Sequence, residues 1–144
     1  MDWVTEQIAL SEYPSSKTDL SRFDGILNLD RYTPYKTDVR LAHMPLIDGP
    51  GNPPDSVADV LECMDGLLEG GGRLLVHCAA GVSRSPFVIA LYLSWKQGMA
   101  FDDAIDLVAA RRSRNLNIDP GLSAISREVL DVMDRRGGNG RHGR

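Results

Sequence analysis

A cysteine and an arginine, six residues apart in the middle of the chain, have the types and spacing of a nucleophile placed in an oxyanion-binding loop. Cys78 follows the short apolar run 74–76, and Arg84 precedes the long apolar run 87–95. The backbone N–H groups of a loop between a buried strand and a buried helix can converge on one anion, with the positive end of the helix dipole behind it. A thiol in such a field ionises readily, and a guanidinium offers two donors to a phosphate. We therefore expect a thiolate at Cys78 beside an anion receptor.

The residues between Cys78 and Arg84 are small or apolar, and we expect them to act mainly through their backbone. Gly81 permits a close approach of N–H groups to the ligand. An arginine at a helix start is disfavoured by the dipole, which itself argues for an anionic partner. Phosphate oxygens are thus expected to be bound by Arg84 and by the N–H groups of Ala79, Ala80, Gly81, Val82 and Ser83.

Strands and helices alternate along the chain, which predicts an α/β fold, a single domain whose central, mostly parallel twisted sheet is flanked by helices. Strands are expected within 3–10 and at 25–29, 39–46 and 74–76, and helices at 17–23, 57–68, 87–95, 102–112 and 120–133. Asp55 or Ser56 is expected to cap the second helix, and Asp119 with Pro120 to begin the last. The domain is expected to span 1–134, followed by a disordered, basic, Gly-rich tail at 135–144.

Composition narrows the class of protein. The 144 residues are 42% apolar, enough for one domain with a core, and the net charge of −4 argues against nucleic-acid binding. A run of 18 apolar residues is lacking, so no membrane span is expected, and the N-terminus does not read as a secretory signal. Two cysteines and three histidines have no metal-ligand spacing. We expect a cytoplasmic monomer with no metal and no cofactor.

The segment HCAAGVSRS, residues 77–85, strongly resembles the signature of the cysteine-dependent protein phosphatases, in the form common to the dual-specificity branch and its small atypical members. The segment HMPLIDG, residues 43–49, is similar to the family segment in which an aspartate begins the general-acid loop, and Asp48 lies 30 residues before Cys78. The resemblance covers residues 3–132 and implies a protein tyrosine phosphatase-like fold.

The resemblance also implies a role for each site residue. Cys78 would be the nucleophile that forms a cysteinyl-phosphate, and Arg84 would clamp the phosphoryl oxygens. Asp48 would protonate the leaving group and then, as a carboxylate, activate water. Ser85 would stabilise the departing thiolate, and His77 would order the loop and support ionisation of the cysteine.

Two of these assignments have alternatives. Asp48 precedes Gly49, and Asp-Gly is a common turn pair, so it could be a turn residue. Asp55 is the competing general acid, although a helix cap explains it better. Ser85 stands ahead of Pro86, where a helix cap is an alternative role.

Other residues near the motif are open to a functional or a structural interpretation. Cys63 suits packing on its helix, whereas some relatives pair a second cysteine with the nucleophile. Tyr32 and Tyr35 either shape one wall of the pocket or are partly exposed loop aromatics. Three arginines lie at the end of a predicted helix, where positive charge is favoured by the helix dipole: Arg111, Arg112 and Arg114. Alternatively, one or more of them contacts a second substrate phosphate or an acidic partner.

The resulting prediction is a phosphoprotein phosphatase acting on phosphotyrosine, with phosphoserine and phosphothreonine as further candidates. The chain has no room for the long insert that deepens tyrosine-specific pockets, so a shallow site is expected. A phosphatase of a non-protein phosphomonoester such as a phosphoinositide is the alternative, although such relatives tend to carry lysines in the loop. A sulfur transferase, an arsenate reductase and a non-catalytic phosphate-binding module are less consistent with the GVSRS ending and with Asp48.

Overall fold

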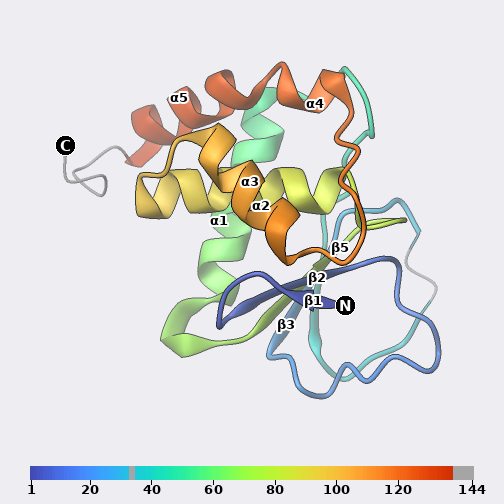
Figure 1. Ribbon diagram of the computed structural model, residues 1–144. Coiled ribbons are helices and arrows are strands. Elements are labelled where there is room, and N and C mark those ends of the chain that lie inside the picture. Colours follow the sequence, from blue (N-terminus) through green and yellow to red (C-terminus); the bar gives the residue numbers. More distant parts are fainter. Residues whose placement is uncertain (33–34, 138–144) are drawn as a thin grey trace.

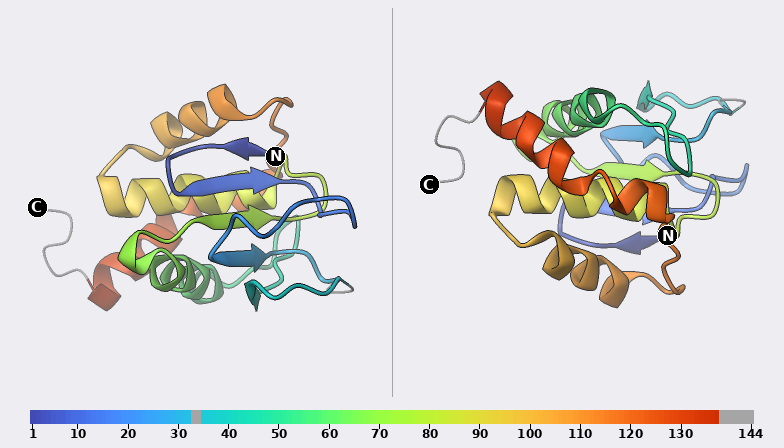
Figure 2. Two further views of the ribbon diagram at one scale, coloured as in Figure 1. Left: turned by 90° about the horizontal axis from the view of Figure 1, so that it is seen from below. Right: turned by 90° about the horizontal axis from the view of Figure 1, so that it is seen from above.

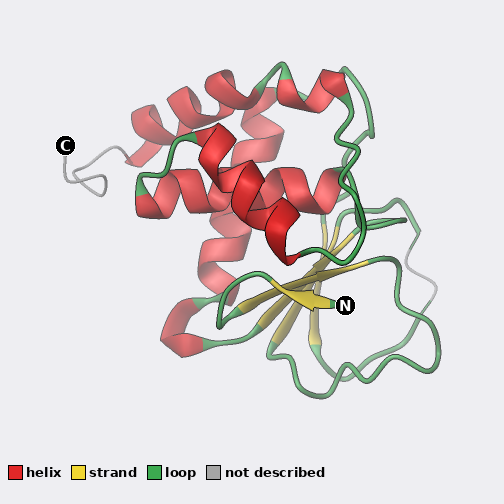
Figure 3. Cartoon of the chain, viewed as in Figure 1, coloured by secondary structure: helices red, strands yellow, loops and turns green. Residues whose placement is uncertain are grey.

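A five-stranded sheet with helices packed on it organises the chain (Figures 1 and 3). The computed structural model describes residues 1–32 and 35–137. None of the helices in these ranges is long and apolar enough to cross a membrane. In chain order the elements are β1 (Asp2–Trp3), β2 (Ile8–Ser11), β3 (Gly25–Asn28), β4 (Arg40–His43), α1 (Pro54–Leu67), the short 3-10 helix η1 (Glu69–Gly71), β5 (Leu74–His77), α2 (Arg84–Gln97), α3 (Phe101–Arg111), α4 (Pro120–Ser123) and α5 (Ser126–Gly137).

The strand order is β1-β2-β5-β3-β4, and only the pairing of β1 with β2 is antiparallel among the described strands. The predicted α/β fold with a mostly parallel sheet is therefore confirmed. Ser11 of β2 and Asn28 of β3 both pair with His77 of β5. The carboxyl ends of three neighbouring strands thus meet at one edge, and the segments that follow them are brought together there.

The two faces of the sheet are covered differently. The large core lies on the face that carries the long helices, which Figure 2 shows from opposite sides. Helix α2 is buried from Ser85 to Trp95, as expected for a central helix without a polar face. The other face carries a small cluster around Ile26 and Leu75, which Phe23 and Trp3 cover.

The expected helix at 17–23 is wrong, because this segment forms turns. Short polar side chains bond to nearby backbone groups instead: Thr18 Oγ1 accepts from Ser15 N–H at 3.0 Å, and Asp19 Oδ1 accepts from Ser21 N–H at 3.0 Å. Local bonds of this kind compete with the hydrogen bonds of a helix.

Two helix starts were expected from capping residues. Asp119 caps α4 as expected, since its Oδ1 accepts from the N–H of Gly121 at 2.8 Å. The expected cap of α1 by Asp55 or Ser56 is wrong. That helix begins at Pro54 with no side-chain cap, because proline at the first helical position supplies the required φ and has no N–H to satisfy.

The C-terminal helical region departs from the expectation of one helix to residue 133. It is divided into α4 and α5, and α5 continues to Gly137, three residues past the expected domain end. Arg136 explains the extension, because its Nη1 lies 2.8 Å from Asp59 and 3.0 Å from Glu62 of α1. The rest of the expected disordered tail, 138–144, lies outside the described residues.

Candidate active site

Cys78 follows β5 directly and is almost fully buried. Its Sγ lies 3.3 Å from Ser85 Oγ, which is also buried. Helix α2 begins at Arg84, with Ser83 in the N-cap position, so Ser85 lies inside the first turn and is not the cap. The hydroxyl of Ser85 is consequently available to the sulfur, which it can stabilise by donating a hydrogen bond.

The loop carbonyls of residues 79–82 all bond to groups outside the loop. The carbonyl of residue 79 accepts from Tyr13 N–H at 2.8 Å, and that of residue 82 accepts from Asn117 N–H at 2.8 Å. The carbonyls of residues 80 and 81 accept from the guanidinium of Arg112 at 3.2 and 3.0 Å. In a trans peptide the N–H of the next residue points the opposite way. The N–H groups of residues 80–83 therefore face the inside of the loop, and none has a hydrogen-bond partner among the described residues.

Glycine is required at Gly81 for two reasons. Its φ is +72°, in the left-handed region that side chains disfavour. A Cβ at this position would lie 2.8 Å from the Ser11 carbonyl and 2.6 Å from Arg112 Nη2. The close approach is thus to groups behind the loop, whereas the sequence suggested an approach to the ligand.

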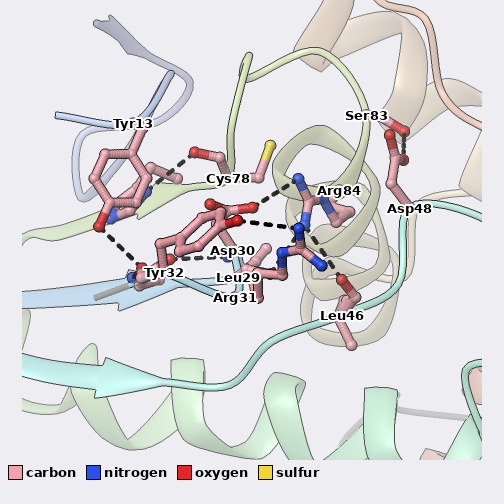
Figure 4. Close-up of polar contacts among 12 residues, drawn as sticks. Tyr13, Leu29, Asp30, Arg31, Tyr32, Leu46, Asp48, Cys78, Ser83 and Arg84 are labelled. Atoms are coloured by element: carbon pink, nitrogen blue, oxygen red, sulfur yellow. Dashed lines mark hydrogen bonds and ion pairs between the residues drawn. The ribbon is translucent and has the colours of Figure 1, made fainter. Parts of the chain in front are cut away.

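Arg84 reaches back over the loop from the start of α2 (Figure 4). Its Nη2 lies 3.2 Å from Asp30 Oδ1, and its Nη1 donates to the carbonyls of Leu29 at 3.4 Å and Leu46 at 3.3 Å. The buried Nε has no hydrogen-bond partner within residues 1–32 and 35–137. A buried, unsatisfied charged donor is costly, so this edge of the guanidinium is the one that a phosphate oxygen would satisfy.

Asp30 is a site residue that the sequence analysis missed, because a charged residue in a polar loop is usually solvated. A signal was present in the sequence. Asp30 directly follows the strand predicted at 25–29, and in a mostly parallel sheet the residues that follow neighbouring strands meet at one edge, as Asp30 and Cys78 do.

His77 supports the loop from below and is buried. Its Nε2 lies 2.7 Å from the hydroxyl of Tyr35, and its Nδ1 lies 3.3 Å from the carbonyl of Cys78. Burial lowers the pKa of His77 to about 4, so the ring is neutral at pH 7. A neutral ring with the proton on Nδ1 satisfies both contacts, accepting from Tyr35 and donating to the Cys78 carbonyl.

The two tyrosines considered for the pocket wall occupy different places. Tyr35 packs on His77 and makes a T-shaped contact with Tyr13, and burial raises the pKa of Tyr35. The side chain of Tyr32 is exposed, and its hydroxyl accepts from Arg31 Nη2 at 3.0 Å (Figure 4).

Asp48 and its competitor Asp55 are clearly separated by the structure. Asp48 lies beside the loop, and its Oδ1 accepts from Ser83 Oγ at 2.5 Å (Figure 4). Asp55 is exposed on α1 and lies 3.5 Å from Arg136 of α5. The structure therefore brings Asp48 and not Asp55 to the cysteine loop.

Arg112 does more than complement the dipole of its helix, the role that the sequence favoured. It follows the end of α3, and its side chain is only 1% exposed. Besides the two loop carbonyls, it contacts Asp2 at 2.8 Å and Glu12 at 3.3 Å. Arg114, which is exposed, also donates to a loop carbonyl at 3.3 Å. These arginines hold the outer side of the loop.

Both cysteines are free thiols. Cys63 is packed against the core on α1, and burial raises its pKa. Across residues 1–32 and 35–137, no three His, Cys, Asp or Glu side chains gather as a metal site would require.

Comparison with known proteins identifies the family. The family model described as "dual specificity phosphatase, catalytic domain" matches residues 8–124. The chain belongs to the dual specificity phosphatase family. The chain is 37% identical over 79 residues to protein-tyrosine-phosphatase MKP1 of Arabidopsis thaliana, covering 54% of this chain and 10% of the plant protein. It is 32% identical over 111 residues to dual specificity protein phosphatase OPG106 of vaccinia virus, covering 67% of this chain and 60% of the viral protein.

The fold of this member of the family is shared with solved structures. Human DUSP28 superposes with a TM-score of 0.82 at 19% identity, covering 95% of this chain and 100% of that one. The predicted protein tyrosine phosphatase-like fold is thereby confirmed.

Proposed function

We propose that this chain is a phosphoprotein phosphatase that hydrolyses phosphotyrosine, and also phosphoserine and phosphothreonine, through a cysteinyl-phosphate intermediate. One observation carries the proposal. Within the part of the chain that the structure describes, the Nε of Arg84 and the inward N–H groups of residues 80–83 are donors without acceptors, in the loop that begins at Cys78. A phosphoryl group supplies the missing oxygens, and membership of the family supports the reaction.

The first half-reaction follows from this placement. The thiolate of Cys78 attacks phosphorus, while the loop N–H groups and Arg84 bind the oxygens on which charge accumulates in the transition state. Asp48, protonated, donates its proton to the departing oxygen as the P–O bond breaks. The dephosphorylated residue leaves, and phosphorus remains bonded to sulfur.

The second half-reaction regenerates the enzyme. Asp48, now a carboxylate, accepts a proton from water as the water oxygen attacks phosphorus. The P–S bond breaks, and Ser85 donates a hydrogen bond to the departing thiolate from 3.3 Å. Inorganic phosphate then leaves the loop.

The partner would be a phosphorylated protein or peptide, and we further propose that the enzyme acts as a cytoplasmic monomer without a metal. Ala79, Ala80 and Val82 occupy the loop positions where phosphatases of phosphoinositides tend to carry lysine. This composition favours a protein substrate over a phosphoinositide.

Replacing the nucleophile tests the proposal. The wild type should hydrolyse p-nitrophenyl phosphate in EDTA, and Cys78→Ser should have no measurable turnover, because a neutral hydroxyl is a poor nucleophile. Cys63→Ser is the matched control and should retain wild-type kcat, since Cys63 lies on α1, outside the loop. Turnover by Cys78→Ser, or an absolute requirement for metal, would contradict the mechanism.

A further inference from the structure

The loop that carries Asp48 is folded back on itself by one buried asparagine. Asn52 Oδ1 accepts from Ile47 N–H at 2.8 Å, and its Nδ2 donates to the carbonyls of Ile47 at 2.8 Å and Gly49 at 3.3 Å. These bonds span both sides of Asp48. The segment 47–52 is therefore a closed unit whose position depends on what touches it from outside.

One outside contact is the hydroxyl of Ser83, which is buried in the cysteine loop. Its oxygen accepts from Asp119 N–H at 3.0 Å and lies 2.5 Å from Asp48 Oδ1. A hydroxyl has one proton. Because the backbone N–H of Asp119 can only donate, the hydroxyl proton is directed to Asp48 Oδ1. With Oδ1 accepting from Ser83, the geometry favours Oδ2 as the oxygen that carries the proton used in catalysis, and no hydrogen bond to Oδ2 is made by the described residues.

The second outside contact is made by a glycine without a side chain. Gly121, in the first turn of α4, packs directly on the backbone of the Asp48 loop. A Cβ at this position would lie 2.2 Å from the nitrogen of Pro50 and 2.6 Å from the carbonyl carbon of Gly49. Both are backbone atoms, so any side chain here must displace the loop.

We propose that Ser83 and Gly121 are positioning residues that hold the general acid Asp48 in its working place before substrate binds. The Ser83 hydroxyl sets the orientation of the carboxyl group, and Gly121 sets how closely the segment 47–52 packs on α4. The inference rests on the proposed function, because it assigns to these residues the proton-transfer step of that reaction.

The test uses a series of aryl phosphates of increasing leaving-group pKa, from p-nitrophenyl phosphate to phenyl phosphate. A poor leaving group needs the proton from Asp48, whereas a good one does not. Gly121→Ala should lower kcat/KM for phenyl phosphate by about 100-fold and for p-nitrophenyl phosphate by less than about threefold. Ser83→Ala should show the same selectivity with a loss of roughly tenfold, and Ser83→Thr, which keeps the hydroxyl, should recover most of it.

Two comparisons separate positioning from damage. Gly66→Ala on α1 is the matched control, since a Cβ there meets no atom within 4 Å, and it should leave the whole series unchanged. In an Asp48→Asn background, Gly121→Ala and Ser83→Ala should cause no further loss, because the step they support is already absent.

Several results would overturn the inference. If kcat/KM falls by the same factor across the series, the substitution has damaged the cysteine loop itself. Weaker inhibition by inorganic phosphate would mean the same. Full activity of Gly121→Ala on phenyl phosphate would mean that the packing of Gly121 does not determine the position of Asp48. Failure of the proposed function has a different signature, namely a wild type that turns over none of the series or does so without Cys78.

Discussion

At the scale of single residues, Asp30 determines which edge of Arg84 is available. Its carboxylate lies 3.2 Å from Nη2, and the carbonyls of Leu29 and Leu46 occupy Nη1. The guanidinium cannot rotate without losing these partners, so its Nε edge stays directed into the site. Because the side chain of Arg84 is already ordered, it loses little conformational entropy when the phosphate binds.

The identity of the general acid is also a question about single residues. Asp48→Asn should lower kcat/KM for a phosphotyrosine peptide by about 100-fold or more, because the amide has no proton to give to the leaving oxygen. Asp55→Asn should stay within about twofold of the wild type, since this residue pairs with Arg136. Steady-state kinetics of the two variants on one peptide decides between them, and the reverse order of effects would move the role to Asp55.

At the scale of elements, the apolar runs and the turn residues between them predicted the strand and the helix that position the site. The apolar runs at 74–76 and 87–95 fall within β5 and α2, and the loop between them is where expected. The contacts that hold the loop were not predictable, because they come from Tyr13, Arg112 and Asn117, which are distant in sequence. A sequence pattern reports local burial, whereas these partners are brought together only by the strand order.

Arg112 connects the end of α3 to the first two strands and to the phosphate loop, so its removal should affect both stability and binding. Arg112→Met should lower the free energy of unfolding by about 3 kcal/mol, because Asp2 loses its ion pair, the Gly81 carbonyl loses its donor and the Ala80 carbonyl keeps only Arg114. It should also weaken competitive inhibition by inorganic phosphate. The neighbouring exposed Arg111→Met should change stability by less than about 0.5 kcal/mol. Urea denaturation of both variants checks this, and equal effects would mean that the network does not stabilise the loop.

At the scale of the whole molecule, the fold class and strand direction were predictable, but the chain ends and surface segments were not. Residues 17–23 had the length of a helix, yet local hydrogen bonds made them turns. The basic, Gly-rich composition of 135–144 predicts a disordered tail, yet three carboxylates of α1 hold Arg136. Charge pairing across helices leaves no periodic signal in the sequence.

Stability of the whole molecule should depend on pH through His77. Burial lowers its pKa to about 4 in the folded state, against about 6.5 when unfolded. Between these values only the unfolded state binds the proton, so stability should fall as the pH falls through this window. The loss should be about 2 kcal/mol between pH 7 and pH 5.

Urea unfolding at several pH values measures this slope. In His77→Asn, whose amide can still donate to the Cys78 carbonyl, the decline between pH 7 and pH 5 should be smaller by that amount. An unchanged slope in this variant would place the titrating group elsewhere.

The unequal covering of the two sheet faces gives this protein a pair of built-in optical reporters. Trp3 lies on the face without helices, with its ring centroid 5.4 Å from that of Phe23. Trp95 lies within the helical layer, with its ring centroid 5.7 Å from that of Tyr92. The chain has two tryptophans in all. Replacing either one leaves a fluorophore that reports on a single layer, so the order in which the two layers form during refolding is open to direct observation.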